Sequence, residues 1–283
     1  KPTGDIDDSE LLGITELDAS YWGIQDISGL EYCKNLEYLI LGYNAISDIS
    51  PLGELTHLAI LDLGANSIVD ISPLADLVSL QYLGLSENQI SETGPLRNLT
   101  GLLGLSLDWN NIADISPLAE LHMLQYLSAS ANYIEDLSPL ANMVNLADLT
   151  LSGNAITDLA PLATLTALEY LDLGSNLVCE LGPLAGLAGL AVLDLSYCEL
   201  EDISGLATLT SLQYLGIEGN RVANIAPLGN LQNLTSLSLS YNQIMDISPL
   251  LSLPQLQSVY LYGNPLGTQA LCIDIPAMIA LAV

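Results

Sequence analysis

The chain has 283 residues, half of them hydrophobic, and it carries 33 acidic side chains against four lysines and arginines, for a formal net charge of −29. Four scattered cations cannot form the basic surface that phosphate groups require, so this composition argues against nucleic-acid binding and against docking on anionic lipid. A basic partner or a divalent cation is compatible with the charge. So is an acidic surface that serves only solubility or adaptation to salt.

The first residues, KPTGDIDDSEL, do not resemble a signal peptide. Further along, no apolar run reaches the ~18–20 uninterrupted residues of a membrane-spanning helix, because polar positions divide the hydrophobic stretches. We therefore expect no membrane insertion. The hydrophobic residues instead follow a strict period along residues 14–266.

An asparagine recurs every 22 residues over this segment, from Asn44 to Asn264, without a slip in register. Cys198 takes one of these positions, and Trp22 stands one step upstream of the first. A leucine follows eight residues after nearly every position, usually with a proline directly before it. A fixed period of this length indicates about twelve repeats stacked into a solenoid.

Residues 58–79, LAILDLGANSIVDISPLADLVS, represent one repeat. Leu61 and Leu63 alternate with outward positions and predict a short strand with one buried face. Pro73 has no N–H to donate, and the PLADL segment that it begins is too short for a full α-helix, so a 3₁₀ turn is expected there. Each asparagine amide is expected to bond the backbone groups that the bend leaves unpaired.

The repeat LxxLxLxxNxIxDISPLxxL, nearly intact at residues 36–55, 58–77 and 102–121, resembles the bacterial internalin-like leucine-rich repeats. The resemblance implies an α/β leucine-rich-repeat solenoid: a curved right-handed rod with a parallel concave β-sheet and short 3₁₀ or turn segments on the convex side. It also implies protein binding and an extracellular or bacterial cell-surface location.

Both ends depart from the repeat. In the resembling family a helical cap covers the first strand, so residues 1–13 are interpreted as the remnant of an N-terminal cap. Residues 267–283 are mostly apolar, and we expect a C-terminal cap helix there because solenoids need covered ends.

Two residue classes are assigned to structure. The aspartate of DISPL, such as Asp48 or Asp114, is expected to accept hydrogen bonds from the turn that follows it. The cysteines are expected to be four free thiols that act as small apolar side chains. Cys33 occupies a position that holds a core leucine in other repeats, Cys198 takes an asparagine position, and Cys272 lies in the C-terminal cap. Cys179 occupies a surface position.

The columns that face outward on the concave sheet hold eleven of the thirteen tyrosines. One tyrosine row recurs every 44 residues, in alternate repeats. This row is either a ligand-matching stripe or the product of duplicated two-repeat blocks. The aromatic residues predicted to bind a partner are Tyr38, Tyr43, Tyr82, Trp109, Tyr126, Tyr170, Tyr197, Tyr214, Tyr241, Tyr260 and Tyr262.

Acidic residues share these columns, without any lysine or arginine. Asp172 and Asp194 occupy one column of neighbouring strands, where like charges repel unless a cation lies between them. With Asp148 and Glu218 they form the best candidate for a contact with Lys, Arg or Ca²⁺. The pattern matches no linear calcium loop, so no metal site or cofactor is assigned.

Nothing in the sequence predicts catalysis. The only histidines, His57 and His122, fall in return segments three repeats apart, and HExxH, CxxC and GxSxG motifs are absent. We expect a monomeric protein-binding module, secreted or surface-displayed, whose partner presents a basic patch. Two alternatives stay open: a carbohydrate or cell-envelope binder that uses the same aromatic face, and a purely structural repeat spacer.

Overall fold

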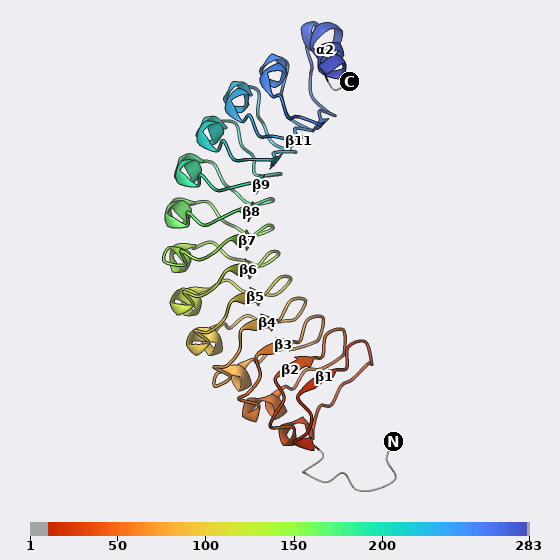
Figure 1. Ribbon diagram of the computed structural model, residues 1–283, viewed down its shortest axis with the longest axis vertical. Coiled ribbons are helices and arrows are strands. Elements are labelled where there is room, and N and C mark those ends of the chain that lie inside the picture. Colours follow the sequence, from red (N-terminus) through yellow and green to blue (C-terminus); the bar gives the residue numbers. More distant parts are fainter. Residues whose placement is uncertain (1–10, 282–283) are drawn as a thin grey trace. The chain divides into compact units, whose positions relative to one another are not determined.

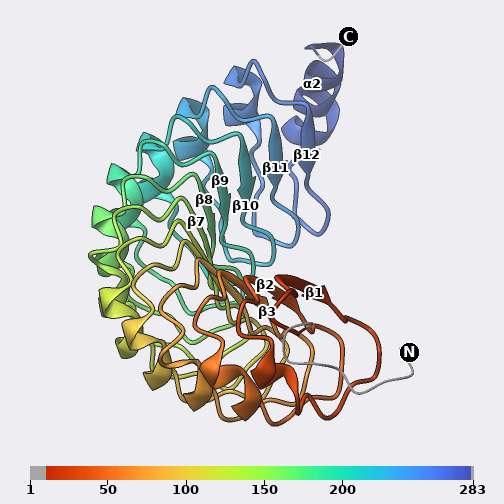
Figure 2. The same cartoon turned by 60° about the horizontal axis from the view of Figure 1, so that its bottom comes forward.

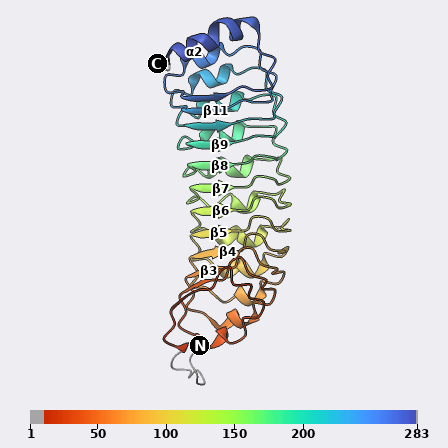
Figure 3. The ribbon, with the colours of Figure 1, turned by 90° about the vertical axis from the view of Figure 1, so that its right-hand side faces the viewer.

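The computed structural model describes residues 11–281, which belong to two compact units, residues 1–134 and 135–283. Most of the expected N-terminal cap remnant, residues 1–13, lies outside the described residues. In each unit the strands line one side and the 3₁₀ segments the other (Figure 1). Figure 3 turns the strand side of each unit toward the viewer.

The first unit has one parallel sheet whose strands follow each other in chain order and pair in a register of 22 residues, for example Leu39 with Leu61 and Leu61 with Leu83. Its strands are β1 (Glu16–Asp18), β2 (Tyr38–Ile40), β3 (Ile60–Asp62), β4 (Tyr82–Gly84), β5 (Gly104–Ser106) and β6 (Tyr126–Ser128). Its 3₁₀ segments are η1 (Leu30–Tyr32), η2 (Ser50–Glu54), η3 (Ser72–Leu74), η4 (Gly94–Asn98) and η5 (Ser116–Glu120).

The second unit repeats this arrangement (Figure 2). Its strands are β7 (Asp148–Thr150), β8 (Tyr170–Asp172), β9 (Val192–Asp194), β10 (Tyr214–Gly216), β11 (Ser236–Ser238) and β12 (Ser258–Tyr260). Its 3₁₀ segments are η6 (Ser138–Leu140), η7 (Ala160–Thr164), η8 (Gly182–Gly186), η9 (Ser204–Thr208), η10 (Ala226–Asn230) and η11 (Ser248–Ser252). The predicted leucine-rich-repeat solenoid, with its parallel strands and 3₁₀ segments, is confirmed.

Leucine columns form the core of each unit. In β3, Leu61 is buried while Ile60 and Asp62 are half-exposed, and Leu63 points back into the core. The inward leucines of successive repeats are almost completely shielded from water, and a buried side chain of this size contributes about 1.5–3 kcal/mol to folding. A repeat obtains this burial only from its neighbours, so the repeats stabilise one another.

The asparagine column acts as expected. Asn66 donates through Nδ2 to the carbonyl oxygens of Leu41 and Leu63, both at 3.0 Å, and its Oδ1 accepts from Ile46 N–H at 2.9 Å. One amide therefore satisfies backbone groups of its own repeat and of the preceding repeat. Asn110 makes the same set of bonds two periods further along the chain.

The DISPL aspartates cap the turns that follow them, as predicted. Asp48 Oδ1 accepts from Ser50 N–H at 2.8 Å, directly before Pro51. The backbone and hydroxyl hydrogen bonds from Ser50 hold the pKa of Asp48 below its usual range. The same backbone bond is made by Asp26, Asp70, Asp114, Asp136, Asp158, Asp202 and Asp246, and by Asn224.

All four cysteines are free thiols, as expected. Cys33 and Cys198 are buried and Cys179 is exposed, but Cys272 is also exposed, so its predicted packing as an apolar side chain is wrong. The Cys198 thiol donates to the Leu173 carbonyl oxygen at 3.2 Å. Burial raises the pKa of Cys198 to about 11, so this group stays a neutral thiol at physiological pH.

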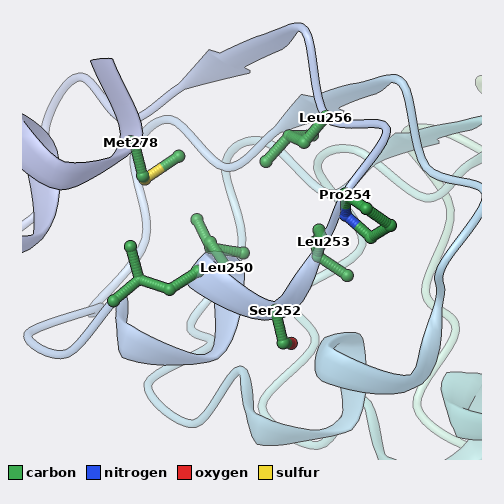
Figure 4. A pocket seen from close by; sticks show the side chains of 7 residues that line it. Leu250, Ser252, Leu253, Pro254, Leu256 and Met278 are labelled. Atoms are coloured by element: carbon green, nitrogen blue, oxygen red, sulfur yellow. The ribbon is translucent and has the colours of Figure 1, made fainter. Parts of the chain in front are cut away.

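After the last strand the chain forms a π-helical turn, η12 (Ala270–Asp274), that continues into α2 (Ile275–Leu281). A pocket of about 330 Å³ lies between this helix and the preceding repeat, lined mainly by Leu250, Leu253, Leu256 and Met278 (Figure 4). The helix thus lies against the apolar end of the last repeat. Over the described range, no helix combines the length and the apolar character that crossing a membrane requires.

Candidate binding face

The first and third residues of each strand point away from the core. We call these positions the sheet face. In β4, for example, Tyr82 is exposed and Gly84 half-exposed on either side of the buried Leu83. The period of 22 residues places equivalent sheet-face residues on neighbouring strands, as in the Asp172–Asp194 pair of β8 and β9.

The five tyrosines of the alternate-repeat row all lie on the sheet face, but they are not equivalent. Tyr38, Tyr82 and Tyr126 in the first unit are exposed, whereas Tyr170 and Tyr214 in the second are half-buried. The Tyr214 hydroxyl donates a long hydrogen bond to Asp194 Oδ2, at 3.4 Å. Burial, followed by the charge of Asp194, raises the pKa of Tyr214 to about 12, so it remains a neutral phenol.

The residue directly before each asparagine position forms a second row beside the sheet face, which we call the ridge. All twelve ridge residues adopt a left-handed backbone, with φ between 53° and 74°. They are Tyr21, Tyr43, Ala65, Glu87, Trp109, Ala131, Gly153, Ser175, Tyr197, Gly219, Tyr241 and Gly263.

Five ridge positions carry aromatic side chains, and all five are exposed. Trp109 exposes 68% of its surface and Tyr21 exposes 71%. A left-handed backbone costs a residue with a side chain about 1–2 kcal/mol, whereas glycine adopts it freely. Since glycine occupies only three of the twelve positions, most ridge residues carry a conformational cost that the fold does not require.

Several ridge aromatics make contacts that fix their orientation. The rings of Tyr21 and Tyr43 stack with centroids 4.3 Å apart and 8° between their planes. Tyr241 meets Tyr262 edge-on at 5.2 Å. The ring of Tyr197 covers Gly219, where a Cβ atom would clash with it.

The predicted acidic residues differ in how far their charge is already satisfied. Glu218 accepts from the hydroxyls of Tyr197 at 2.7 Å and Ser238 at 3.1 Å. Asp194 Oδ1 accepts from Ser196 N–H at 2.8 Å. Asp172 Oδ1 accepts from Gly174 N–H at 2.9 Å.

Burial, more than the adjacent Asp194, raises the pKa of Asp172. Burial likewise raises the pKa of Asp148, and its Oδ1 is buried without a hydrogen-bond partner. Within residues 11–281, no group of three or more His, Cys, Asp or Glu side chains is arranged to hold a metal ion.

Two further features were not predicted from the sequence. Trp22 and Tyr21 lie next to each other at the start of the repeats and expose 78% and 71% of their surfaces. Neither is among the aromatic residues predicted from the sequence to bind a partner. The left-handed ridge backbone was also missed. Its signal was weak, because glycine marks only Gly153, Gly219 and Gly263. Tyr260 and Tyr262, which were selected, are exposed at the last strand.

A family model described as leucine-rich repeats (2 copies) matches residues 34–76, 144–186 and 232–270. The solved structure of the internalin InlF from Listeria monocytogenes is 35% identical in sequence, covers 98% of this chain and 87% of that chain, and superposes with a TM-score of 0.82. The chain belongs to the internalin family. Internalin C2 of the same organism is 40% identical and covers 68% of this internalin-family chain and 84% of its own, with a TM-score of 0.66.

A more distant likeness concerns the fold alone. The plant peptide hormone receptor RGFR1, solved in complex with RGF2, is 23% identical, covers 93% of the internalin-family chain and 50% of its own, and has a TM-score of 0.71. None of the curated proteins matches the chain. Leucine-rich-repeat proteins, internalins and receptors included, act as protein-interaction modules, and the internalin-like members are non-enzymatic.

Proposed function

We propose that this chain is the protein-binding module of a secreted or surface-displayed bacterial protein, and that the partner contacts the sheet face and the ridge. The exposed aromatic side chains on the left-handed ridge carry this proposal. Residues held in a sparsely populated backbone conformation cluster at functional sites, and these five aromatic side chains are exposed, outside the leucine core. Exposed Tyr and Trp side chains are enriched at the centres of protein interfaces.

The charge of the same surface indicates a basic partner. No lysine or arginine occupies a sheet-face or ridge position among the described residues. Lys34 pairs with Glu54 near the 3₁₀ segments at 3.3 Å, and Arg221 pairs with Glu199 at 2.8 Å. The sheet face therefore has acidic residues without cationic neighbours, and complementary charge speeds association and selects partners.

Affinity capture from extracellular protein mixtures tests the proposal when two matched variants accompany the wild type. One replaces Tyr126, Tyr170 and Trp109 by alanine. The other replaces three equally apolar exposed residues that follow 3₁₀ segments, Val78, Met123 and Val144, by serine. The partner is the protein retained by the wild type and the serine variant and lost by the alanine variant. A set of captured proteins that is the same for all three excludes the sheet face as the binding surface.

The dependence on salt separates a protein partner from a carbohydrate. Attraction between acidic residues and a basic patch weakens as the ionic strength rises from about 0.05 to about 0.5 M, because the Debye length shortens roughly threefold over this range. Stacking of tyrosine rings on sugars does not weaken in this way. A salt-insensitive signal on a glycan array would favour the carbohydrate alternative. We further propose that the module acts as a monomer, which light scattering checks directly.

A further inference from the structure

We propose that a hollow between the ridge residues Tyr43 and Glu87 binds an arginine side chain presented by the protein partner. This inference rests on the proposed function and names the partner chemistry that one part of the surface accepts. The hollow has a volume of about 270 Å³ and lies over β3 and β4. Tyr43, Asp62, Gly64, Gly84 and Glu87 line it.

The floor of the hollow depends on glycines around one carboxylate. A Cβ atom on Gly84 would lie 2.7 Å from Asp62 Oδ1, closer than real Cβ contacts allow. A Cβ atom on Gly64 would lie 3.2 Å from the same oxygen, and one on Gly42 would lie 3.3 Å from Oδ2. The Asp62 carboxylate therefore lies flat on the sheet, and the missing side chains leave the space beside it open.

The hollow carries negative charge that the described residues leave unpaired. Asp62 Oδ1 accepts from Gly64 N–H at 2.9 Å, and neither its Oδ2 nor the Glu87 carboxylate has a hydrogen-bond or ion-pair partner among residues 11–281. Glu87 follows two repeats after Tyr43 along the ridge. An incoming cation would thus meet acceptors on the floor and at the rim.

The ring of Tyr43 forms one wall of the hollow. Tyr43 is half exposed and stacks on Tyr21 at 4.3 Å, which holds both rings in place. Partial desolvation, then the neighbouring Tyr43, and more weakly the charges of Asp62 and Glu87, raise the pKa of Tyr21. The carboxylates are therefore close enough to act on the ring pair electrostatically.

Arginine fits this combination better than other cations do. Its planar guanidinium stacks on aromatic faces while its N–H groups donate side by side to a carboxylate. Lysine presents a point charge without the planar stacking. Calcium requires six to eight oxygen ligands, and the described residues form no group of three or more acidic, His or Cys ligands.

The second unit offers an internal comparison. Asp172 lies in the same column as Asp62, and Gly174 beside it corresponds to Gly64. However, the ridge residue of the repeat before Asp172 is Gly153, where the hollow has Tyr43. The carboxylate there has no aromatic wall, so arginine selectivity is expected at Asp62 and not at Asp172.

A titration followed by amide nuclear magnetic resonance tests the proposal on the intact chain. The probe is the capped peptide acetyl-Gly-Arg-Gly-amide, with the citrulline and lysine versions as controls. The arginine peptide should shift the amide signals of Gly64, Gly84 and Glu87 saturably, the citrulline peptide should not, and the lysine peptide should bind severalfold more weakly.

Variants complete the test. Asp62→Asn keeps the acceptor for Gly64 N–H, and Tyr43→Gly suits the left-handed backbone; each should weaken arginine binding at least about tenfold. Asp76→Asn removes an exposed carboxylate after η3, away from the sheet face and the ridge, and should leave arginine binding unchanged. Equal binding of citrulline, binding unaffected by Asp62→Asn, or displacement of the same signals by calcium chloride alone would overturn the proposal. A captured partner distinguishes the two proposals. If the triple alanine variant of Tyr126, Tyr170 and Trp109 loses this partner while Asp62→Asn binds it with full affinity, the arginine hollow is refuted and the proposed function stands.

Discussion

The hydroxyl of Tyr197 donates a hydrogen bond to Glu218 Oε1 at 2.7 Å, across two neighbouring repeats. Tyr197 has a left-handed backbone with φ of 58°, and its ring covers Gly219. The side chain is thus fixed by contacts outside the leucine core, at a residue whose backbone carries a conformational cost. An aromatic group held in one orientation loses little entropy when a partner binds.

Trp109→Gly separates the fold from binding. Trp109 has φ of 55° and is 68% exposed, so glycine should raise the free energy of unfolding by about 1 kcal/mol while removing a contact surface. Urea denaturation measures the first effect and partner affinity the second. Ala131→Gly, at an equivalent ridge position without an aromatic ring, should stabilise similarly and leave affinity unchanged. A clear loss of stability in Trp109→Gly would show that the ring serves the fold.

Asn110→Ala should be among the more damaging single substitutions in the first unit. Asn110 is buried, donates to the carbonyl oxygens of Leu85 and Leu107 at 3.0 Å, and accepts from Ile90 N–H at 2.9 Å. Alanine leaves these buried groups without partners, at a cost of about 3 kcal/mol. The exposed neighbour Asn111 provides the control, since Asn111→Ala should change the urea midpoint little. Equal effects of the two substitutions would contradict the structural role of the asparagine column.

Cys198→Asn should stabilise the second unit. Val178 is buried, and among the described residues its N–H has no acceptor, whereas Ile156 N–H in the preceding repeat bonds Asn176 Oδ1 at 3.0 Å. An asparagine at position 198 supplies the missing oxygen, and we expect a gain of about 1 kcal/mol in the free energy of unfolding. Cys179→Asn, at an exposed thiol, should be neutral. Destabilisation by Cys198→Asn would mean that this position cannot accommodate the amide.

Asp172→Asn should stabilise the chain in a manner that depends on pH. Burial raises the pKa of Asp172 above 3.8, so the native state disfavours the charged form that prevails at neutral pH. The wild type is therefore penalised above the folded-state pKa, and the penalty vanishes below pH 3.8. The variant should have the higher urea midpoint at pH 7 and an equal one at pH 3. An advantage that persists at pH 3 would assign the effect to packing.

The repeat architecture could be predicted from the sequence because every repeat buries the same set of apolar side chains against its neighbours. A column such as Leu61, Leu83 and Leu105 repeats one environment, so its period defines strand register and core together. The asparagine and DISPL columns were predicted for the same reason, since each makes a bond to a fixed neighbour along the chain.

The candidate site was less predictable because the surroundings of each sheet-face residue depend on which residue occupies the neighbouring repeat, and that residue varies along a column. Asp108 and Gly64 occupy the same column. Gly64 leaves an open space there, whereas Asp108 Oδ1 accepts from Ser130 N–H at 2.7 Å. Tyr82 is exposed and Tyr214 half-buried, although they belong to one row. Such differences follow from the residue on the next strand, such as Gly104 beneath the ring of Tyr82, and the period of the repeat does not specify that residue.

The most direct test of the sheet face and ridge as the binding surface is the affinity of a purified captured partner, measured by calorimetry. The account predicts that alanine at Tyr126, Tyr170 and Trp109 together weakens binding at least about 100-fold, as the loss of interface aromatic residues does elsewhere. Serine at Val78, Met123 and Val144 should leave affinity unchanged. Undiminished affinity of the alanine variant, with its fold intact by urea denaturation, would contradict the account.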